Sequence, residues 1–157
     1  MKRILYCLFG FIILCPATKG LAQQEPDCRG PVEVCNFFKH FVSVFNERDW
    51  KQFSECLAED VTGMFDASWA PERKEGRKSV ESMFGPMFPA AGAAPDKDRF
   101  LIKPEDLLIQ DLGDAAVISF HMRNPGNFAR RCLVVRKKNN KWQIVYINGS
   151  SFSVLPK

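Results

Sequence analysis

The chain has 157 residues, of which 46% are hydrophobic and 25% are charged, and its formal net charge is +4. Most of this charge comes from residues 1–22, which contain three basic residues and no acidic residue; in the rest of the chain 19 basic residues face 18 acidic ones. The remaining basic residues are scattered or lie in turns such as 136–138, so no phosphate-binding stripe is predicted and nucleic acid is not an expected partner.

Residues 1–22 have the pattern of an export signal. Basic residues precede an apolar run over Ile4–Leu14, and small residues lie just before Gln23, where we expect cleavage. The apolar run is too short for a permanent membrane span, and lipid attachment at Cys15 is a less favoured alternative because bulky Leu14 precedes it. We therefore expect an exported protein, periplasmic or secreted, with no membrane association after cleavage.

Residues 23–157 form the expected mature protein, which is long enough for a single domain with a hydrophobic core and too short for two. Its four cysteines allow three disulfide pairings, and the sequence does not choose among them. We expect at least one disulfide; the alternative is that three of the four are small buried apolar residues. Histidine is scarce and no Cys-x-x-Cys pair occurs, so neither a metal nor a cofactor is expected. The cysteines are Cys28, Cys35, Cys56 and Cys132.

The first half of the mature chain predicts helices. After Pro31, apolar residues recur at steps of three and four, which indicates an amphipathic helix with the stripe Val32, Cys35, Phe38, Phe41, Val42 and Phe45. Asp49, followed three residues later by Gln52, is typical of a capping box that begins a shorter second helix through Leu57. A short strand is expected over 60–66, paired with residues 72–75.

A third helix is expected over Arg77–Phe84, ended by the prolines that follow it. The last third predicts a β-meander. One run covers 107–110 and continues past a turn at 111–114 into 115–122; two more runs cover 130–136 and 142–148. Helices gathered first and strands last predict an α+β domain, in which a curved antiparallel sheet wraps around three N-terminal helices.

Several short motifs occur in a particular order. The first helix ends in Asn46-Glu-Arg-Asp-Trp50, Glu59-Asp-Val61 leads a short strand, Gly76, Arg77 and Val80 open the third helix, and Trp142-x-Ile-Val145 opens the last strand. Together they resemble the SnoaL-like, ketosteroid-isomerase-like members of the nuclear transport factor two superfamily over most of residues 31–152. The resemblance implies a cone-shaped fold with a pocket inside the curved sheet, and a possible homodimer through the outer face of the sheet.

The last strand supplies candidate ligand-binding residues. If Trp142 faces the interior, strict alternation directs Ile144, Tyr146, Asn148 and Ser150 the same way. A pocket lined by this row of side chains, apolar at one end and polar at the other, suits a small, largely apolar molecule with one polar end. Trp142 and Ile144 have an alternative role as core residues, whereas Tyr146 and Asn148 are better candidates for pocket polarity because a buried hydroxyl or amide needs a partner.

Candidate catalytic residues are Asp66 and His121. Asp66 lies close to where enolising members of the superfamily place a carboxylate base, and an apolar pocket would raise its pKa; alternatively it caps the turn that follows. A histidine can serve as an acid or a base near neutral pH, which makes His121 a candidate; the alternative is a structural role. Arg130 could neutralise a ligand carboxylate, pair with Asp66 or face solvent. Tyr146 is the single tyrosine after residue 22 and lies on the last strand, which argues against the steroid-isomerase mechanism.

Three hypotheses follow. The first is an exported domain that binds a small apolar molecule. The second is an isomerase, dehydratase or hydrolase of the same fold that uses Asp66 or His121 as its base. The third is a dimerisation or interaction module without a working pocket. The second requires Asp66, His121, Arg130 and Tyr146 to meet in one cavity.

Overall fold

The computed structural model describes residues 28–68, 70–88, 100–124 and 126–153; the predicted leader lies outside these ranges. The helices are α1 (Val32–Glu47), α2 (Trp50–Glu55), α3 (Arg77–Phe84) and the short 3-10 helix η1 (Gly85–Met87). The strands are β1 (Leu57–Met64), β2 (Lys74–Glu75), β3 (Glu105–Asp111), β4 (Ala115–Asn124), β5 (Asn127–Lys138) and β6 (Lys141–Ser153). Within the described ranges, no helix has the length and apolar character needed to cross a membrane.

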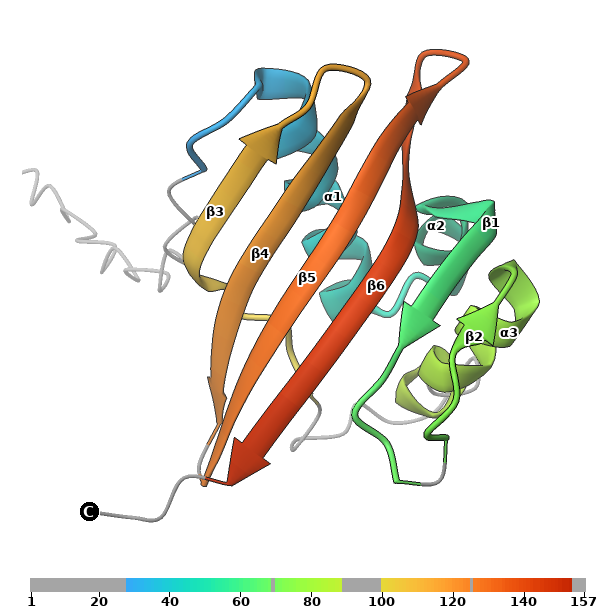
Figure 1. The fold of residues 1–157 in the computed structure, drawn as a ribbon, viewed down its shortest axis with the longest axis vertical. Coiled ribbons are helices and arrows are strands. Elements are labelled where there is room, and N and C mark those ends of the chain that lie inside the picture. The colour runs from blue at the N-terminus through green and yellow to red at the C-terminus, as the bar shows by residue number, and fades with distance from the viewer. Residues whose placement is uncertain (1–27, 69, 89–99, 125, 154–157) are drawn as a thin grey trace, which may run out of the picture.

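The six strands form one curved sheet in the order β2-β1-β6-β5-β4-β3. All neighbours are antiparallel except β1 and β6, which run parallel. The predicted curved sheet is confirmed, and the expectation of antiparallel strands fails only at this junction, which joins strands far apart in sequence. Figure 1 shows α1 and α2 behind the sheet and α3 beside β1 and β2. The sheet thus has an inner face toward the helices and an outer face free of them.

The predicted helices form for local reasons that the sequence contains. The side chain of Asp49 caps α2 by accepting from the backbone N–H of Gln52, and Arg48 ends α1 in a left-handed conformation with a φ of 64°. The apolar stripe of α1 faces the sheet, except that Val32 is 74% exposed. Val32 is the first residue of the helix and is exposed to solvent, although Glu33 beside it already contacts Lys137 and Trp142 of the sheet.

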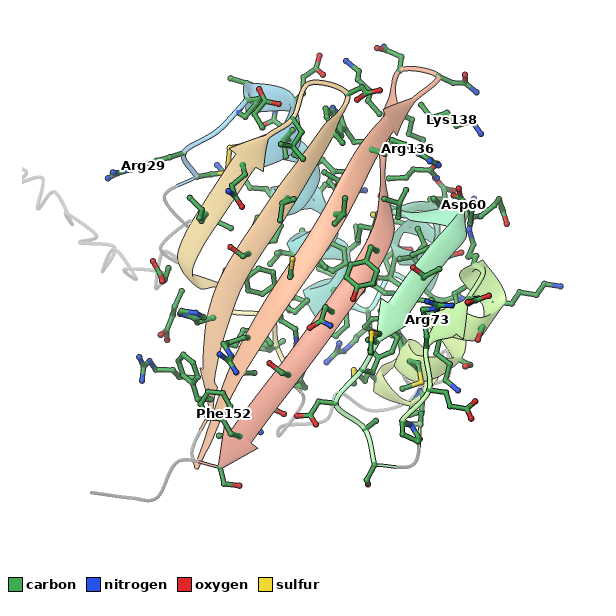
Figure 2. The ribbon with its side chains drawn as sticks, in the orientation of Figure 1. Arg29, Asp60, Arg73, Arg136, Lys138 and Phe152 are labelled. Atoms are coloured by element: carbon green, nitrogen blue, oxygen red, sulfur yellow. A yellow bond between two sulfur atoms is a disulfide. The ribbon has the colours of Figure 1, made fainter. Side chains whose placement is uncertain are left out.

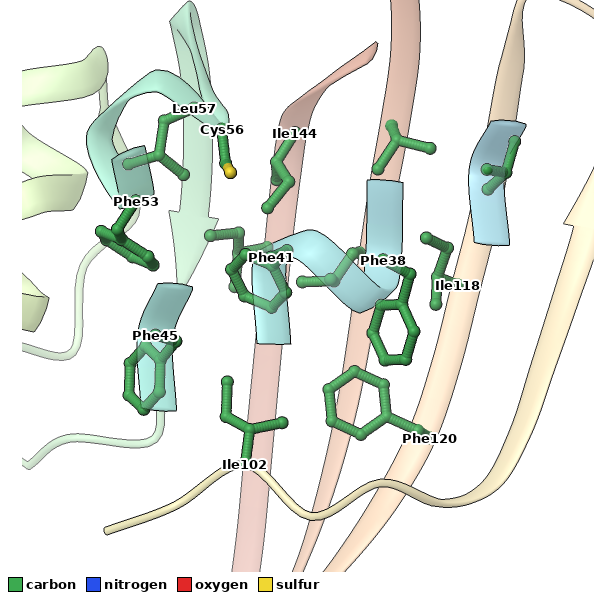
Figure 3. Packing of buried hydrophobic residues seen from close by; sticks show 14 of the residues in the cluster. Phe38, Phe41, Phe45, Phe53, Cys56, Leu57, Ile102, Ile118, Phe120 and Ile144 are labelled. Atoms are coloured by element: carbon green, nitrogen blue, oxygen red, sulfur yellow. The ribbon is translucent and has the colours of Figure 1, made fainter. Parts of the chain in front are cut away.

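Phenylalanines dominate the core between the helices and the inner face (Figure 3). The rings of Phe38 on α1 and Phe120 on β4 lie 5.3 Å apart between centroids, which couples the helix to the middle of the sheet. Phe53 of α2 is fully buried, with ring centroids 6.0 Å from Phe41 and 5.8 Å from Phe45. Burial of this apolar surface is the main force that holds the two layers together.

A β-bulge at Val145 changes which side chains of β6 face inward. Val135 pairs with Ile144 but Val134 pairs with Tyr146, so Val145 is an extra residue in β6. Ile144 and Ile147 are both buried, and Gly149 follows Ile147 on the inner face. The prediction that Tyr146, Asn148 and Ser150 share the face of Trp142 is wrong, because strict alternation ends at the bulge.

One disulfide joins Cys28 to Cys35, tying the segment before α1 to its first turns. Cys56 and Cys132 are free thiols. Cys56 is buried at the C-terminal cap of α2, just before β1, and burial raises its pKa to about 11.

Candidate functional site

A cavity of about 430 Å³ lies between the helices and the inner face of the sheet. Its walls are mostly aromatic and aliphatic. The helices contribute Phe41, Phe45, Met83 and Phe84, and the sheet contributes Phe120, Met122, Leu133 and Ile147. The volume falls within the range of about 300–1,000 Å³ that is typical of small-molecule sites. The layers therefore do not fill the whole space between them.

One wall of the cavity is fixed by hydrogen bonds to the end of α1. The amide nitrogen of Asn46 donates to the carbonyl oxygen of Ile102 at 2.9 Å, and its side-chain oxygen accepts from the backbone N–H of Ile102 at 2.8 Å. The guanidinium of Arg48 donates to the carbonyl oxygen of Phe100. Both Phe100 and Ile102 line the cavity, so the hydrogen bonds hold this extended segment across its side.

Asp66, a predicted site residue, lies in the cavity lining where the chain leaves β1. Its carboxylate accepts hydrogen bonds from the hydroxyl of Ser151 and, at 2.6 Å, from the Ser151 backbone N–H. These bonds lower the pKa of Asp66, the hydroxyl contributing most. The expectation that apolar surroundings would raise this pKa is wrong, because Asp66 is exposed and its charged form is hydrogen-bonded.

Arg131, and not Arg130, is the arginine of the cavity. Along β5 it is two residues from the buried Ala129 and two from the buried Leu133. It therefore lies on the same face as both and points inward. Burial lowers the pKa of its guanidinium, and the charge of Asp66 opposes this effect. Arg131 is not among the predicted site residues; the sequence signal that identifies it is the inward row of Leu133 and Val135, two and four residues further along the same strand.

The outer face carries the other predicted polar residues. His121 lies opposite Arg130 in the β4–β5 pair, and both line a second hollow of about 710 Å³, together with Asn148. The ring nitrogen Nδ1 of His121 is 3.4 Å from the Asp106 carboxylate. The amide of Asn148 donates to the hydroxyl of Tyr146 at 3.3 Å. This hollow is larger than the inner cavity, but it lies on the surface of the sheet rather than between two layers.

Arg130 contacts an exposed aromatic residue at one end of the sheet. Its guanidinium carbon is 4.8 Å from the ring centroid of Phe152, near the end of β6 (Figure 2). At the other end, Arg136 makes two hydrogen bonds of 3.0 and 3.1 Å to the carboxylate of Asp60 on β1, which lowers the pKa of Asp60. The first contact joins the neighbouring strands β5 and β6, and the second reaches from β5 across β6 to β1.

Trp142 lies on the inner side of the sheet, away from the cavity. Its indole nitrogen donates to the carboxylate of Glu33 at 3.2 Å, and Lys137 pairs with the same carboxylate. The hydrogen bond from Lys137, followed by that from Trp142, lowers the pKa of Glu33. Trp142 thus joins the start of α1 to the sheet. This matches its alternative role as a core residue rather than a role in lining the pocket.

The candidate catalytic residues are divided between the two faces of the sheet. Asp66 lines the inner cavity, whereas His121, Arg130 and Tyr146 lie on the outer face. The geometric condition for the enzyme hypothesis is therefore not met by these four residues. In the described ranges, no three His, Cys, Asp or Glu side chains gather in a way that could hold a metal ion.

Comparisons with known proteins address the fold. The family model described as a SnoaL-like domain matches residues 34–154. No curated protein matches the chain. An NTF2-like protein of unknown function from Pseudomonas putida KT2440 is 18% identical, with a TM-score of 0.62 over 75% of this chain and 83% of that one.

Kinase hub domains are also similar in structure. The CaMKII hub of S. rosetta is 17% identical, with a TM-score of 0.58 over 80% of this chain and 99% of that one. The CaMKII hub homology domain of Chlamydomonas reinhardtii is 20% identical, with a TM-score of 0.56 over 77% and 96% of the two chains. At these identities the likeness shows the shared fold. With its three helices against a curved six-stranded sheet, the chain belongs to the SnoaL-like domain family and has the NTF2-like fold.

Proposed function

We propose that this protein is an exported binding protein for a small, largely apolar molecule, which it holds between α1, α3 and the inner face of the sheet. The observation that carries the proposal is the cavity of about 430 Å³ with its aromatic and aliphatic walls. An apolar ligand that entered it would replace water against Phe41, Phe84 and Ile147, and the apolar area removed from water would favour binding.

The geometry favours binding over catalysis. A base for proton abstraction should have a pKa near the working pH, yet hydrogen bonds from Ser151 hold the pKa of Asp66 below its usual value. His121, the other candidate base, lies on the opposite face of the sheet from the cavity. Of the two candidate bases, a ligand in the cavity would therefore meet only Asp66, whose lowered pKa makes it a weak base.

The test is binding of the neutral dye Nile red, whose fluorescence rises in apolar surroundings. Ile147→Trp would fill the cavity from the sheet side and is expected to reduce dye binding at least about tenfold. Val117→Trp adds the same bulk to the outer face, since Val117 is paired with Val134 there, and should leave dye binding unchanged. Equal dye binding by both variants would contradict the proposal.

Export is the part of the proposal that rests on residues 1–22 alone. Expression of the full chain in a bacterium with a periplasm is expected to give a shortened product beginning at Gln23, found outside the cytoplasm. Amino-terminal sequencing of that product checks the cleavage site. Recovery of only the uncleaved chain from the cytoplasm would contradict it.

A specific observation also favours self-association. The outer face carries a row of half-buried or exposed apolar side chains across neighbouring strands, among them Val117, Val134, Tyr146 and the 55% exposed Leu108. Apolar surface that runs across several strands is typical of an interface. Similar structures include hub domains, so we propose a second copy of this chain as the occupant.

Sedimentation equilibrium tests the homodimer. Val134→Glu would place a charge at the centre of this row, and we expect it to convert a dimer to a monomer. Lys138→Glu, at the exposed end of the same strand, is the control that changes charge without entering the row. A wild-type protein that stays monomeric over the concentration range of the experiment would overturn this part of the proposal.

A further inference from the structure

Arg131 is the one arginine, lysine or histidine in the lining of the inner cavity described here. Its neighbours across the strands are Phe120 on β4 and Gly149 on β6. The guanidinium thus lies in a lining that is mostly apolar and whose other polar side chains are Asp66 and Ser68. Burying part of a cation in such a lining is costly unless the cation is paired.

Gly149 provides the space in which the guanidinium lies. A β-carbon at position 149 would be 3.1 Å from Nη1 of Arg131, 3.3 Å from Cζ and 3.3 Å from Nε. The backbone of Gly149 is not in the left-handed region, so its conformation does not require glycine. Glycine within a strand weakens the strand, and here the missing side chain allows the guanidinium to lie against the backbone.

The protein uses only part of the hydrogen-bonding capacity of Arg131. Nη1 donates to the carbonyl oxygens of Arg130 at 2.9 Å and Ser150 at 3.1 Å. Among the described residues, no carboxylate forms an ion pair with Arg131, and neither Nε nor Nη2 has a hydrogen-bond acceptor. Asp66 is near enough to favour the charged form, but its own hydrogen bonds are to Ser151.

This arrangement is that of an anion-binding site in which the protein orients the guanidinium but leaves some of its N–H donors unused. The two backbone carbonyls fix the orientation of the guanidinium plane, and the remaining N–H groups have the fork geometry that matches a carboxylate. Burial disfavours the charged guanidinium, so an anionic partner would offset a cost that the protein already bears.

We propose that Arg131, held flat against Gly149, binds the carboxylate of a ligand whose apolar body occupies the cavity. The ligand class is therefore a monocarboxylic acid with an aromatic or aliphatic body. The inference rests on the proposed function, because it concerns which apolar molecules the same cavity prefers. It adds a charge requirement that an apolar cavity alone would not impose.

Matched pairs of probes test the charge requirement. 2-Naphthoic acid and 2-naphthamide, or octanoic acid and octanamide, have the same body and differ in the charge of the head group. By titration calorimetry at pH 7, the acid of each pair should bind the wild-type protein at least about tenfold more tightly than the amide. Equal affinities within each pair would overturn the inference.

Variants locate the effect. Arg131→Gln should remove the preference for the acid while leaving amide binding in place, and Gly149→Ala should weaken the preference because the new methyl group displaces the guanidinium. Arg130→Gln is the control: it removes the neighbouring arginine from the outer face and should preserve the preference. Retention of the full preference by Arg131→Gln would overturn the inference, as would its loss in Arg130→Gln alone.

The outcomes separate this inference from the proposed function. If Nile red and the amides bind but the acids have no advantage, the cavity binds apolar molecules and the role of Arg131 is wrong. If neither the dye nor any probe binds, the proposed function is wrong and the inference is overturned with it. Should Arg131→Gln fail to fold by circular dichroism, the comparison of acid with amide on wild-type protein and on Gly149→Ala still decides the matter.

Discussion

Asp66, which follows β1, is hydrogen-bonded to Ser151 near the end of β6. The Asp66 carboxylate accepts hydrogen bonds from both the hydroxyl and the backbone N–H of Ser151. Both strands are long and run parallel, so their ends would otherwise be free to separate. This pair of hydrogen bonds ties the two strands together beside the cavity, whose lining includes Asp66. It also makes stability depend on pH.

Replacing Asp66 with asparagine should lower the free energy of unfolding at pH 7, since an amide oxygen accepts more weakly than a carboxylate. The folded-state pKa of Asp66 lies below the unfolded value of about 3.9, so the charged form stabilises the fold above that pH and the contribution is lost as pH falls through the folded-state pKa. The difference between wild type and Asp66→Asn should therefore shrink toward zero in strong acid.

Urea unfolding of both proteins between pH 3 and pH 7 measures this difference. Glu72→Gln changes an exposed carboxyl that makes no hydrogen bond or ion pair to the described residues; it is the matched control and should track the wild type throughout. A difference for Asp66→Asn that is constant with pH would show that the ionised carboxylate is not what stabilises this end of the sheet.

The core prediction concerns Phe53. It is fully buried in α2, and its ring centroid is 5.0 Å from those of Phe84 and Phe88. Phe53→Ala should cost about 3–5 kcal/mol, from lost apolar burial and the cavity that remains. Phe152→Ala removes the same group from a residue that is 43% exposed and should cost less than about 1 kcal/mol. Thermal unfolding that ranks the two the other way would contradict the described packing.

Local sequence signals were enough to predict most of the elements. The Asp49 and Gln52 cap, the α3 boundaries and the hairpin turn between β5 and β6 each depend on residues within a few positions of one another. Asn139 and Asn140 take φ values of 51° and 60°, as a two-residue hairpin turn requires. The parallel pairing of β1 with β6 could not be obtained this way, because it joins segments about eighty residues apart.

The site was harder to predict than the fold because it depends on register. From Trp142 to Ile144 simple alternation gives the correct face, but one extra residue at Val145 reverses the assignment of Tyr146 and Asn148. On the neighbouring strand, Arg130 and Arg131 point to opposite faces, so a difference of one residue in register decides which of them lines the cavity. No local composition marks a bulge of this kind, since its position follows from the curvature that the whole sheet adopts.

The bulge leads to a direct prediction. Deleting Val145 would remove the extra residue and leave Tyr146 opposite Val134 and Ile147 opposite Leu133, so the side chains of β6 would keep their faces and only the local bend would be lost. The deletion variant should therefore keep a cooperative thermal transition. Val145→Ala keeps the residue count and should change stability by no more than about 1–2 kcal/mol. A deletion variant without cooperative thermal unfolding would show that the fold depends on the bend at the bulge and not only on the register of β6.

The two free thiols offer a probe of the outer face. Cys132 is half-buried on the outer face of β5, and burial raises its pKa; Cys56 is buried, with a pKa of about 11. At pH 8 a thiol with that pKa is only about one thousandth thiolate, and its burial also blocks the reagent. Brief treatment of the native protein with iodoacetamide should therefore modify Cys132 well before Cys56, as peptide mapping would show.

The same labelling experiment reports on self-association. Cys132 lies one position along the strand from the inward-facing Leu133 and pairs across the sheet with Asn148, within the outer face that we propose as the dimer interface. Raising the protein concentration should slow labelling of Cys132 in the wild type and have no effect in Val134→Glu, while Cys56 remains protected in both. Labelling of Cys132 that is independent of concentration in a protein shown to be dimeric would place the interface elsewhere, because a thiol in the middle of a packed sheet face cannot stay accessible to the reagent.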